Sequence, residues 1–83
     1  MSRTALDGNA AAGILFEAFG REMTMVVATC RSCGQTAPLA ETVAYVQTPG
    51  TVLRCRQCSG VLLVVVQQRA ETRVFDRGVT LHL

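Results

Sequence analysis

Two stretches of the sequence, TCRSCG at residues 29–34 and RCRQCSG at residues 54–60, contain every cysteine and decide the fold. Two residues lie between the cysteines of each pair, and 21 residues separate the two pairs. A Cys-x-x-Cys turn can aim both of its sulfurs at one ion about 2.3 Å away, so two such turns complete a tetrahedron. The sequence therefore predicts one structural zinc ion, Zn²⁺, per chain. Its four expected ligands are Cys30, Cys33, Cys55 and Cys58.

Three other uses of paired cysteines fit this sequence less well. A disulfide frame is typical of oxidising compartments, whereas no export signal is evident here. A thioredoxin-like site needs one pair at the start of a helix in a β-α-β unit, and both pairs here lie between expected strands. Iron is the strongest competitor, because four sulfurs in a tetrahedron suit either metal. Rubredoxins place a proline inside the second pair, where this chain has Gln57, and a rubredoxin-like electron carrier stays an alternative.

Glycines follow both cysteine pairs. Gly34 comes directly after the first pair, and Gly60 comes after Ser59. Glycine tolerates a positive φ and lets backbone N–H groups approach the sulfurs. The residues between the pairs, 36–54, fit a β-hairpin that turns at the TPG of residues 48–50.

The bulk composition indicates a small folded protein that needs a staple. A chain of 83 residues buries too little surface for a large core, so a metal is a usual supplement. Its hydrophobic content of 49% and charged content of 17% exclude a disordered chain. The longest apolar run, GVLLVVV, is far shorter than the ~20 residues of a membrane helix. We expect a cytoplasmic protein with reduced thiols and no membrane partner.

A short helix is predicted at the N-terminus, over about residues 6–19. Apolar residues recur there at three- and four-residue spacing, and Asp7 or Asn9 can cap the first turn. Gly20 stands where a C-terminal cap belongs.

The rest of the chain, about residues 23–83, alternates β-rich segments with turn signals. This pattern predicts five or six short antiparallel strands. The expected fold is a small zinc-stabilised α+β domain over residues 1–83, a zinc ribbon with its N-terminal helix packed on a small antiparallel sheet.

The segment Val61–Val66 is apolar at six consecutive positions instead of alternating. A strand of this kind needs cover on both faces. The N-terminal helix supplies one cover, and the alternative is an exposed face or edge used for dimerisation or docking.

Three arginines, Arg31, Arg54 and Arg56, stand next to the cysteines. They form either a small cationic patch that grips phosphate or a partner's carboxylates, or they offset the negative charge of a four-thiolate zinc centre. Four thiolates and one divalent ion bring the formal charge of +2 close to zero. With neither a basic field nor exposed aromatic residues in evidence, a nucleic-acid-binding zinc ribbon stays an alternative that we do not favour.

Catalysis is not expected. Four cysteine ligands leave no open position on the metal, whereas catalytic zinc sites keep one for water. The lone histidine, His82, is the penultimate residue and fits an exposed strand position, and the six acidic residues are scattered. The protein is predicted not to be an enzyme.

The chain resembles a family of small zinc-ribbon proteins of unknown function found mainly in actinobacteria. The resemblance extends almost end to end and rests on LDGNA, CRSCG, PLAE, PGTVLRC, CSGVLL and DRGV. It implies the four cysteine ligands and, because genes of such proteins often neighbour flavin- and molybdenum-dependent oxidoreductases, an accessory role in a redox assembly. We therefore expect a non-catalytic adaptor or regulatory subunit that binds another protein.

Overall fold

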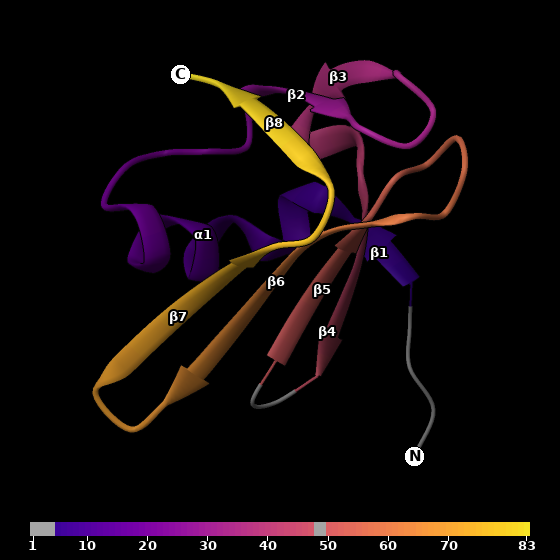
Figure 1. The fold of residues 1–83 in the computed structure, drawn as a ribbon. Helices are drawn as coiled ribbons and strands as arrows, with labels where there is room; N and C mark the ends of the chain where they lie inside the picture. Colours follow the sequence, from indigo (N-terminus) through magenta and orange to yellow (C-terminus); the bar gives the residue numbers. More distant parts are fainter. Residues whose placement is uncertain (1–4, 48–49) are drawn as a thin grey trace.

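The computed structural model describes residues 5–47 and 50–83, whose strands form two antiparallel sheets (Figure 1). The large sheet has the strand order β1-β4-β5-β6-β7, and the small sheet has the order β3-β2-β8. The strands of the large sheet are β1 Ala5–Asp7, β4 Val43–Gln47, β5 Gly50–Arg54, β6 Val61–Gln68 and β7 Glu71–Asp76. The strands of the small sheet are β2 Val27–Cys30, β3 Thr36–Pro38 and β8 Val79–His82. The predicted α+β class with antiparallel sheets is confirmed, although sheet dominates.

The N-terminal helix is shorter than predicted. The helix α1 spans Ala12–Phe19 and follows a single 3₁₀ turn, η1, at Gly8–Ala11. It ends as expected at Gly20, which has a φ of +74° and donates its N–H to the Phe16 carbonyl. The prediction of helix from residue 6 is wrong, because residues 5–7 form β1 and pair with β4.

A tertiary contact at Gly8 explains why the helix begins late. The Gly8 N–H donates to the Thr42 carbonyl at 2.9 Å, and a Cβ on Gly8 would lie 1.9 Å from the Leu39 carbonyl oxygen. This close approach fixes the chain beside η2, the 3₁₀ turn at Leu39–Glu41. Asp7 makes no capping hydrogen bond, because its carboxylate instead accepts from Arg56.

The buried apolar side chains gather between the large sheet, the small sheet and α1. The helix contacts β6 and β7 and covers one face of the large sheet, which we call the inner face (Figure 1). Its Leu15 is fully buried with Leu63 and Val65 of β6. The predicted cover of the Val61–Val66 segment by the N-terminal helix is thus present on one face.

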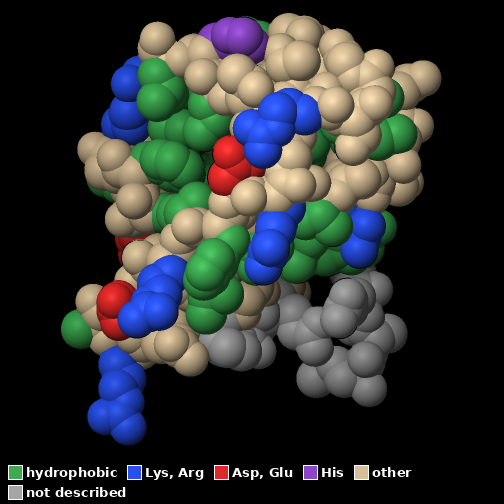
Figure 2. All heavy atoms as spheres, viewed as in Figure 1, with side chains coloured by type: hydrophobic (Ala, Val, Ile, Leu, Met, Phe, Trp, Pro, Cys, Tyr) green, Lys and Arg blue, Asp and Glu red, His purple; other side chains and the backbone are tan. Residues whose placement is uncertain are grey.

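The opposite face of the large sheet, here called the outer face, is only half-buried. Strand pairing places its middle row in one line across four strands, as Tyr45, Val52, Val64 and Phe75. Phe75 is 40% exposed, and the other three are intermediate. Figure 2 shows arginine side chains distributed among hydrophobic ones on this side of the molecule.

The segment between the cysteine pairs contains more than the expected hairpin. Strands β4 and β5 do pair as a hairpin, with Gln47 opposite Gly50, and the predicted TPG turn has residues 48 and 49 outside the described part of the chain. The preceding strand β3 belongs to the small sheet and pairs with β2. The chain therefore passes from the small sheet, at β3, to the large sheet, at β4, through η2.

Candidate metal centre

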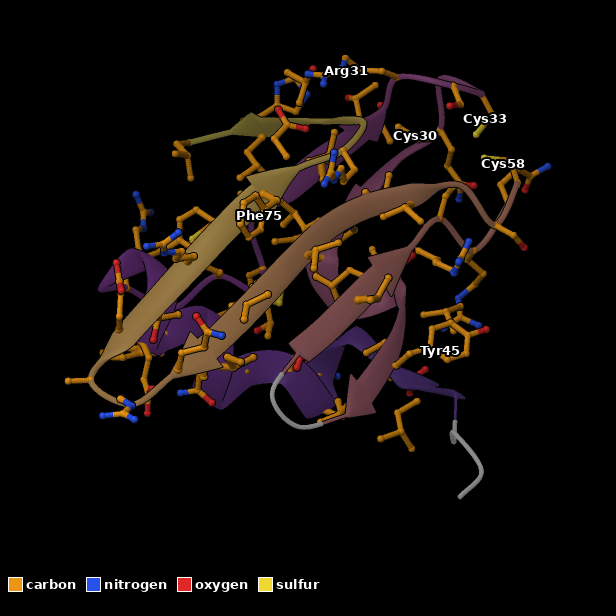
Figure 3. All side chains as sticks on the ribbon, turned by 60° about the horizontal axis from the view of Figure 1, so that its bottom comes forward. Cys30, Arg31, Cys33, Tyr45, Cys58 and Phe75 are labelled. Carbon is orange, nitrogen blue, oxygen red and sulfur yellow. The ribbon has the colours of Figure 1, made fainter. Side chains whose placement is uncertain are left out.

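The four cysteines meet where the two sheets come together. Cys30 is the last residue of β2, and Cys55 directly follows β5. All four sulfurs lie within 4.8 Å of one another, with Sγ–Sγ distances of 3.7 Å from Cys30 to Cys58 and 3.6 Å from Cys33 to Cys55. Figure 3 shows three of these cysteines, Cys30, Cys33 and Cys58, close together at one end of the fold. A tetrahedron with metal–sulfur bonds of about 2.3 Å has edges of about 3.8 Å, so the cluster has the size to hold one metal ion.

These distances exclude disulfides within this arrangement. All four cysteines are free, and sulfurs 3.6 Å apart lie well beyond the bond length of about 2.05 Å. Each close sulfur pair also joins the two turns rather than the two cysteines of one turn. The cluster is therefore one shared site.

Two turns of the same backbone design present the sulfurs; we call residues 30–35 the first knuckle and residues 55–60 the second knuckle. In the first, the Cys30 N–H donates to the Gln35 carbonyl at 2.8 Å. In the second, the Cys55 N–H donates to the Gly60 carbonyl at the same distance. Each knuckle is thus closed across the same five-residue step, and strand geometry on either side holds it in place.

The residue after each second cysteine turns the chain with a positive φ. Gly34 has a φ of +83° and donates to the Cys30 carbonyl at 2.8 Å. Ser59 has a φ of 65° and donates to the Cys55 carbonyl, also at 2.8 Å. The expected role of Gly34 is confirmed, whereas Ser59, and not Gly60, takes the left-handed position in the second knuckle.

Gly60 serves the sulfur instead. Its N–H points to the Cys58 Sγ at 3.4 Å, which supplies the backbone-to-sulfur contact expected of the glycines. A Cβ at this position would lie 3.3 Å from the same sulfur. Glycine therefore keeps the space beside the ligand open.

The thiols influence one another strongly. The backbone N–H of Cys33 lowers the pKa of Cys30 to about 6, against the effect of burial, and the thiol of Cys58 contributes in the same direction. The backbone N–H of Gln35 lowers the pKa of Cys33, but burial and the neighbouring thiols, Cys55 first, raise it to about 12. One thiolate forms readily and further negative charge is resisted, which is the electrostatic situation that a bound cation relieves.

One side of the cluster is buried and the other faces solvent. Cys30 and Cys55, the first cysteine of each knuckle, are 4% and 5% exposed. Cys33 and Cys58, the second of each, are exposed. The knuckles therefore close the core at this end of the fold, where an ion would cross-link the sheets.

Arg31 of the first knuckle is engaged by the turn that joins β7 to β8. Its Nη1 donates to the Val79 carbonyl at 3.1 Å, and its guanidinium forms an ion pair with Asp76 at 3.2 Å. Asp76 also accepts the N–H groups of Gly78 and Val79, and these backbone donors together with Arg31 hold the pKa of its carboxyl below the usual range.

Arg56 of the second knuckle reaches the N-terminal part of the chain. Its Nε donates to the Glu41 carbonyl at 2.8 Å, and its Nη2 donates to the Asp7 carboxylate at 3.0 Å. This arginine therefore ties the knuckle to β1 and η2 at once. Asp7 and Asp76 support the site but were not predicted from the sequence motifs. The short Asp-Gly and Asp-Arg-Gly sequences that contain them are the signal that could have indicated them.

Arg54 differs from the other two arginines. Its Nη1 donates to the Ser59 carbonyl at 2.8 Å, and its guanidinium lies 6.0 Å from the centre of the Tyr45 ring on the outer face. The predicted grouping of Arg31, Arg54 and Arg56 as one cationic patch does not describe these contacts, because each side chain is bound to a different part of the fold. The interpretation that they offset the charge of the centre is likewise incomplete, since each one braces a turn.

His82 lies in β8, exposed, and its Nε2 is 2.8 Å from the Thr29 Oγ1. In the described part of the chain the one group of cysteine, histidine and acidic side chains close enough to share an ion is the four-cysteine cluster. His82 is not in it, as predicted.

A family of unknown function, DUF6510, matches residues 2–83. The chain belongs to this family. No curated protein and no solved structure matches the chain. Among the described residues, no helix has the length and apolar character needed to cross a membrane. This member of DUF6510 thus combines two antiparallel sheets and one short helix with a four-cysteine cluster that could hold a metal ion.

Proposed function

We propose that this DUF6510 protein is a non-catalytic zinc ribbon, in which one Zn²⁺ bound by Cys30, Cys33, Cys55 and Cys58 stabilises a protein-binding adaptor. The single observation that carries the metal assignment is the close match of the Sγ–Sγ distances to a tetrahedral site. Four thiolate ligands leave no coordination position for water or substrate, which supports a structural role. Reduced thiols of this kind belong in the cytoplasm, where we place the protein.

Metal analysis of the purified protein tests the first part of the proposal. We expect one zinc per chain, a colourless protein and loss of the metal in a Cys55→Ser variant. One iron per chain with thiolate-to-iron absorption bands would instead support the rubredoxin-like electron carrier. A metal-free protein that is stably folded would contradict both assignments.

The adaptor role is supported by the outer face of the large sheet. Its row of apolar side chains is only partly buried, whereas α1 contacts β6 and β7 on the opposite face. The resemblance noted for the sequence suggests that the partner is a subunit of a redox assembly, to which this protein would be an accessory or regulatory subunit. Zinc would then act at a distance, by holding the sheet that presents the surface.

A pull-down with matched variants tests the adaptor role. The double variant Val52→Thr/Val64→Thr keeps side-chain shape and strand preference on the outer face but makes its centre polar. The control is Met25→Ser, which removes an apolar side chain that is 74% exposed elsewhere. We expect the first variant to lose the partner and the second to retain it. Equal recovery by both variants, or no stable partner for the native protein, would contradict the proposal.

Nucleic-acid binding is a second candidate, and the arrangement of the outer face is the observation that favours it. Arg54 lies over the Tyr45 ring, and Arg77 lies 5.9 Å from the centre of the Phe75 ring. Aromatic rings beside arginines on an open sheet can stack single-stranded bases and contact phosphates. The expectation that no aromatic residue is exposed is therefore wrong, because Phe75 is 40% exposed.

Titration of fluorescent single-stranded oligonucleotides against salt tests this candidate. Binding that persists at physiological salt, weakens as salt rises and is reduced by Arg54→Gln would favour it. Absence of measurable binding at physiological salt would remove it and leave the protein partner.

A further inference from the structure

Strand β7 forms a free edge of the large sheet. It pairs with β6 on one side, from Gln68 opposite Glu71 to Leu63 opposite Asp76. On its other side no strand is paired with it among residues 5–47 and 50–83, and Figure 1 shows it at the margin of the fold. The Arg77 N–H still donates to the Leu62 carbonyl, so the extended edge continues to residue 77. The Val61–Val66 strand, by contrast, is paired on both sides and offers no edge.

The side chains along this edge follow a definite charge pattern on the outer face. Glu71, Arg73, Phe75 and Arg77 alternate there, while Thr72, Val74 and Asp76 belong to the inner side. Strand alternation and the contact of Arg77 with the Phe75 ring place these residues on the same face. Along the outer face of this edge, the side chains are therefore negative, positive, aromatic and positive in order.

A second copy of the chain could continue the sheet if its β7 ran antiparallel to the first. A two-fold axis perpendicular to the sheet keeps both outer faces on the same side, and it sets each β7 residue opposite its counterpart about a central position. With Val74 opposite Val74, Glu71 faces Arg77 of the second copy, and Arg73 faces Phe75 of the second copy. Each of these contacts occurs twice. They are an opposite-charge pair and a cation–aromatic pair, both of which favour cross-strand pairing.

The neighbouring registers are disfavoured by charge. Moving the axis by one residue to position 73 sets Arg73 against Arg73. Moving it to position 75 sets Arg73 against Arg77 on both sides. Like charges directly opposite one another destabilise a strand pair. The charge pattern therefore favours the register about position 74 over its two immediate neighbours, in contrast to edges whose charges block pairing in every register.

We propose that β7 is a self-association edge, through which two copies of the protein form one continuous ten-stranded sheet with Val74 at the two-fold axis. This proposal goes beyond the adaptor function and does not depend on it. Glu71 must exchange its contact with Arg73, an exposed pair at 3.2 Å, for Arg77 of the second copy. The contact surface is one strand edge, so we expect a weak, concentration-dependent dimer. Its outer faces would lie side by side and present two binding surfaces.

Analytical ultracentrifugation of the metal-loaded full chain tests the proposal through a charge swap. The native protein is expected to change from monomer to dimer as its concentration rises. Glu71→Arg and Arg77→Glu should each weaken the dimer about 10-fold or more, because each sets like charges opposite one another. The double variant Glu71→Arg/Arg77→Glu restores opposite charges and should return the dissociation constant to within about 3-fold of the native value.

Arg21→Glu is the matched control. It makes the same charge change as Arg77→Glu at an exposed position after α1 and should leave the dimer unchanged. A protein that stays monomeric at every concentration overturns the proposal, as does a dimer that is insensitive to the single swaps. Failure of the double variant to recover association overturns the register. None of these outcomes depends on Val52 and Val64, so they are separate from the adaptor test.

Discussion

The two knuckles have the same backbone hydrogen bonds but are attached to the fold in different ways. In each, the first cysteine is buried and its N–H and carbonyl close the turn with bonds of 2.8 Å. The first knuckle depends on the turn after β7, through Arg31 and Asp76, and the second depends on the N-terminal segment, through Arg56 and Asp7. The spacing of the cysteines thus determines the two knuckles. Contacts between residues distant in sequence determine where each knuckle is held in the fold.

Removal of one buried cysteine should have the largest effect, and the effect should be equal in the two knuckles. Cys30→Ser and Cys55→Ser each remove one of the four proposed ligands of a shared ion. Structural zinc contributes roughly 10–16 kcal/mol to folding in zinc-finger peptides, which is comparable to the whole stability of a typical domain, roughly 5–15 kcal/mol. We expect both variants to be unfolded and metal-free, as measured by circular dichroism and metal analysis.

Chelation of the native protein provides the control, since it removes the metal without changing the chain. It should reproduce the unfolding of both variants. A Cys30→Ser variant that stays folded with metal bound, or a large difference between the two variants, would show that the knuckles do not hold one ion together.

The attachment of the first knuckle should matter more than that of the second. Asp76→Ala removes the acceptor of two backbone N–H groups as well as the partner of Arg31, so we expect a loss of about 1–2 kcal/mol. Asp7→Ala removes one ion pair whose carboxylate side chain is 71% exposed, and the loss should stay below about 1 kcal/mol. Thermal unfolding of the metal-loaded proteins measures both. Equal losses would mean that the backbone contacts of Asp76 contribute little.

The cysteine cluster could be predicted from the sequence because its information is local. Two residues between cysteines suffice to form a knuckle, whatever the rest of the chain does. The positions of Arg31 and Arg56 could not be predicted in this way, since their partners are 45 and 49 residues distant along the chain. In the sequence, nothing distinguishes these two arginines from arginines that have no fixed partner.

The N-terminal helix illustrates the opposite limit. Residues 6–11 have the composition and spacing of a helix start, yet a contact of Gly8 with the backbone near Leu39 fixes a strand and a 3₁₀ turn instead. Helix propensity is a weak prior and yields to tertiary packing of this kind. The position of β7 at a free edge could not be predicted from the sequence either. Strand order follows from the sequence only when each strand pairs with its neighbour along the chain.

The left-handed residues provide a smaller test of the similarity between the knuckles. Gly34→Ala should cost about 1 kcal/mol, because the open space around Gly34 leaves backbone strain at φ +83° as the cause. Ser59→Gly should stabilise the second knuckle by about 0.5 kcal/mol, because relief of strain exceeds the added freedom of the unfolded chain. Chemical denaturation with metal present measures both changes. Destabilisation by Ser59→Gly would show that the serine side chain has a role that its backbone conformation does not reveal.

The smallest effect concerns acid, and again it should distinguish the two attachments. The lowered pKa of Asp76 means that its contribution to stability is present above the ordinary carboxyl value of 3.8 and disappears as pH falls through the lower folded value. The difference in unfolding midpoint between the native protein and Asp76→Asn should therefore shrink as the pH falls below about 4 with metal still bound. Metal release in acid affects both proteins, so Asp7→Asn, with the same charge change at the second knuckle, serves as the control. A difference for Asp76→Asn that stays constant over this range would show that the ionised carboxylate is not what holds the turn to Arg31.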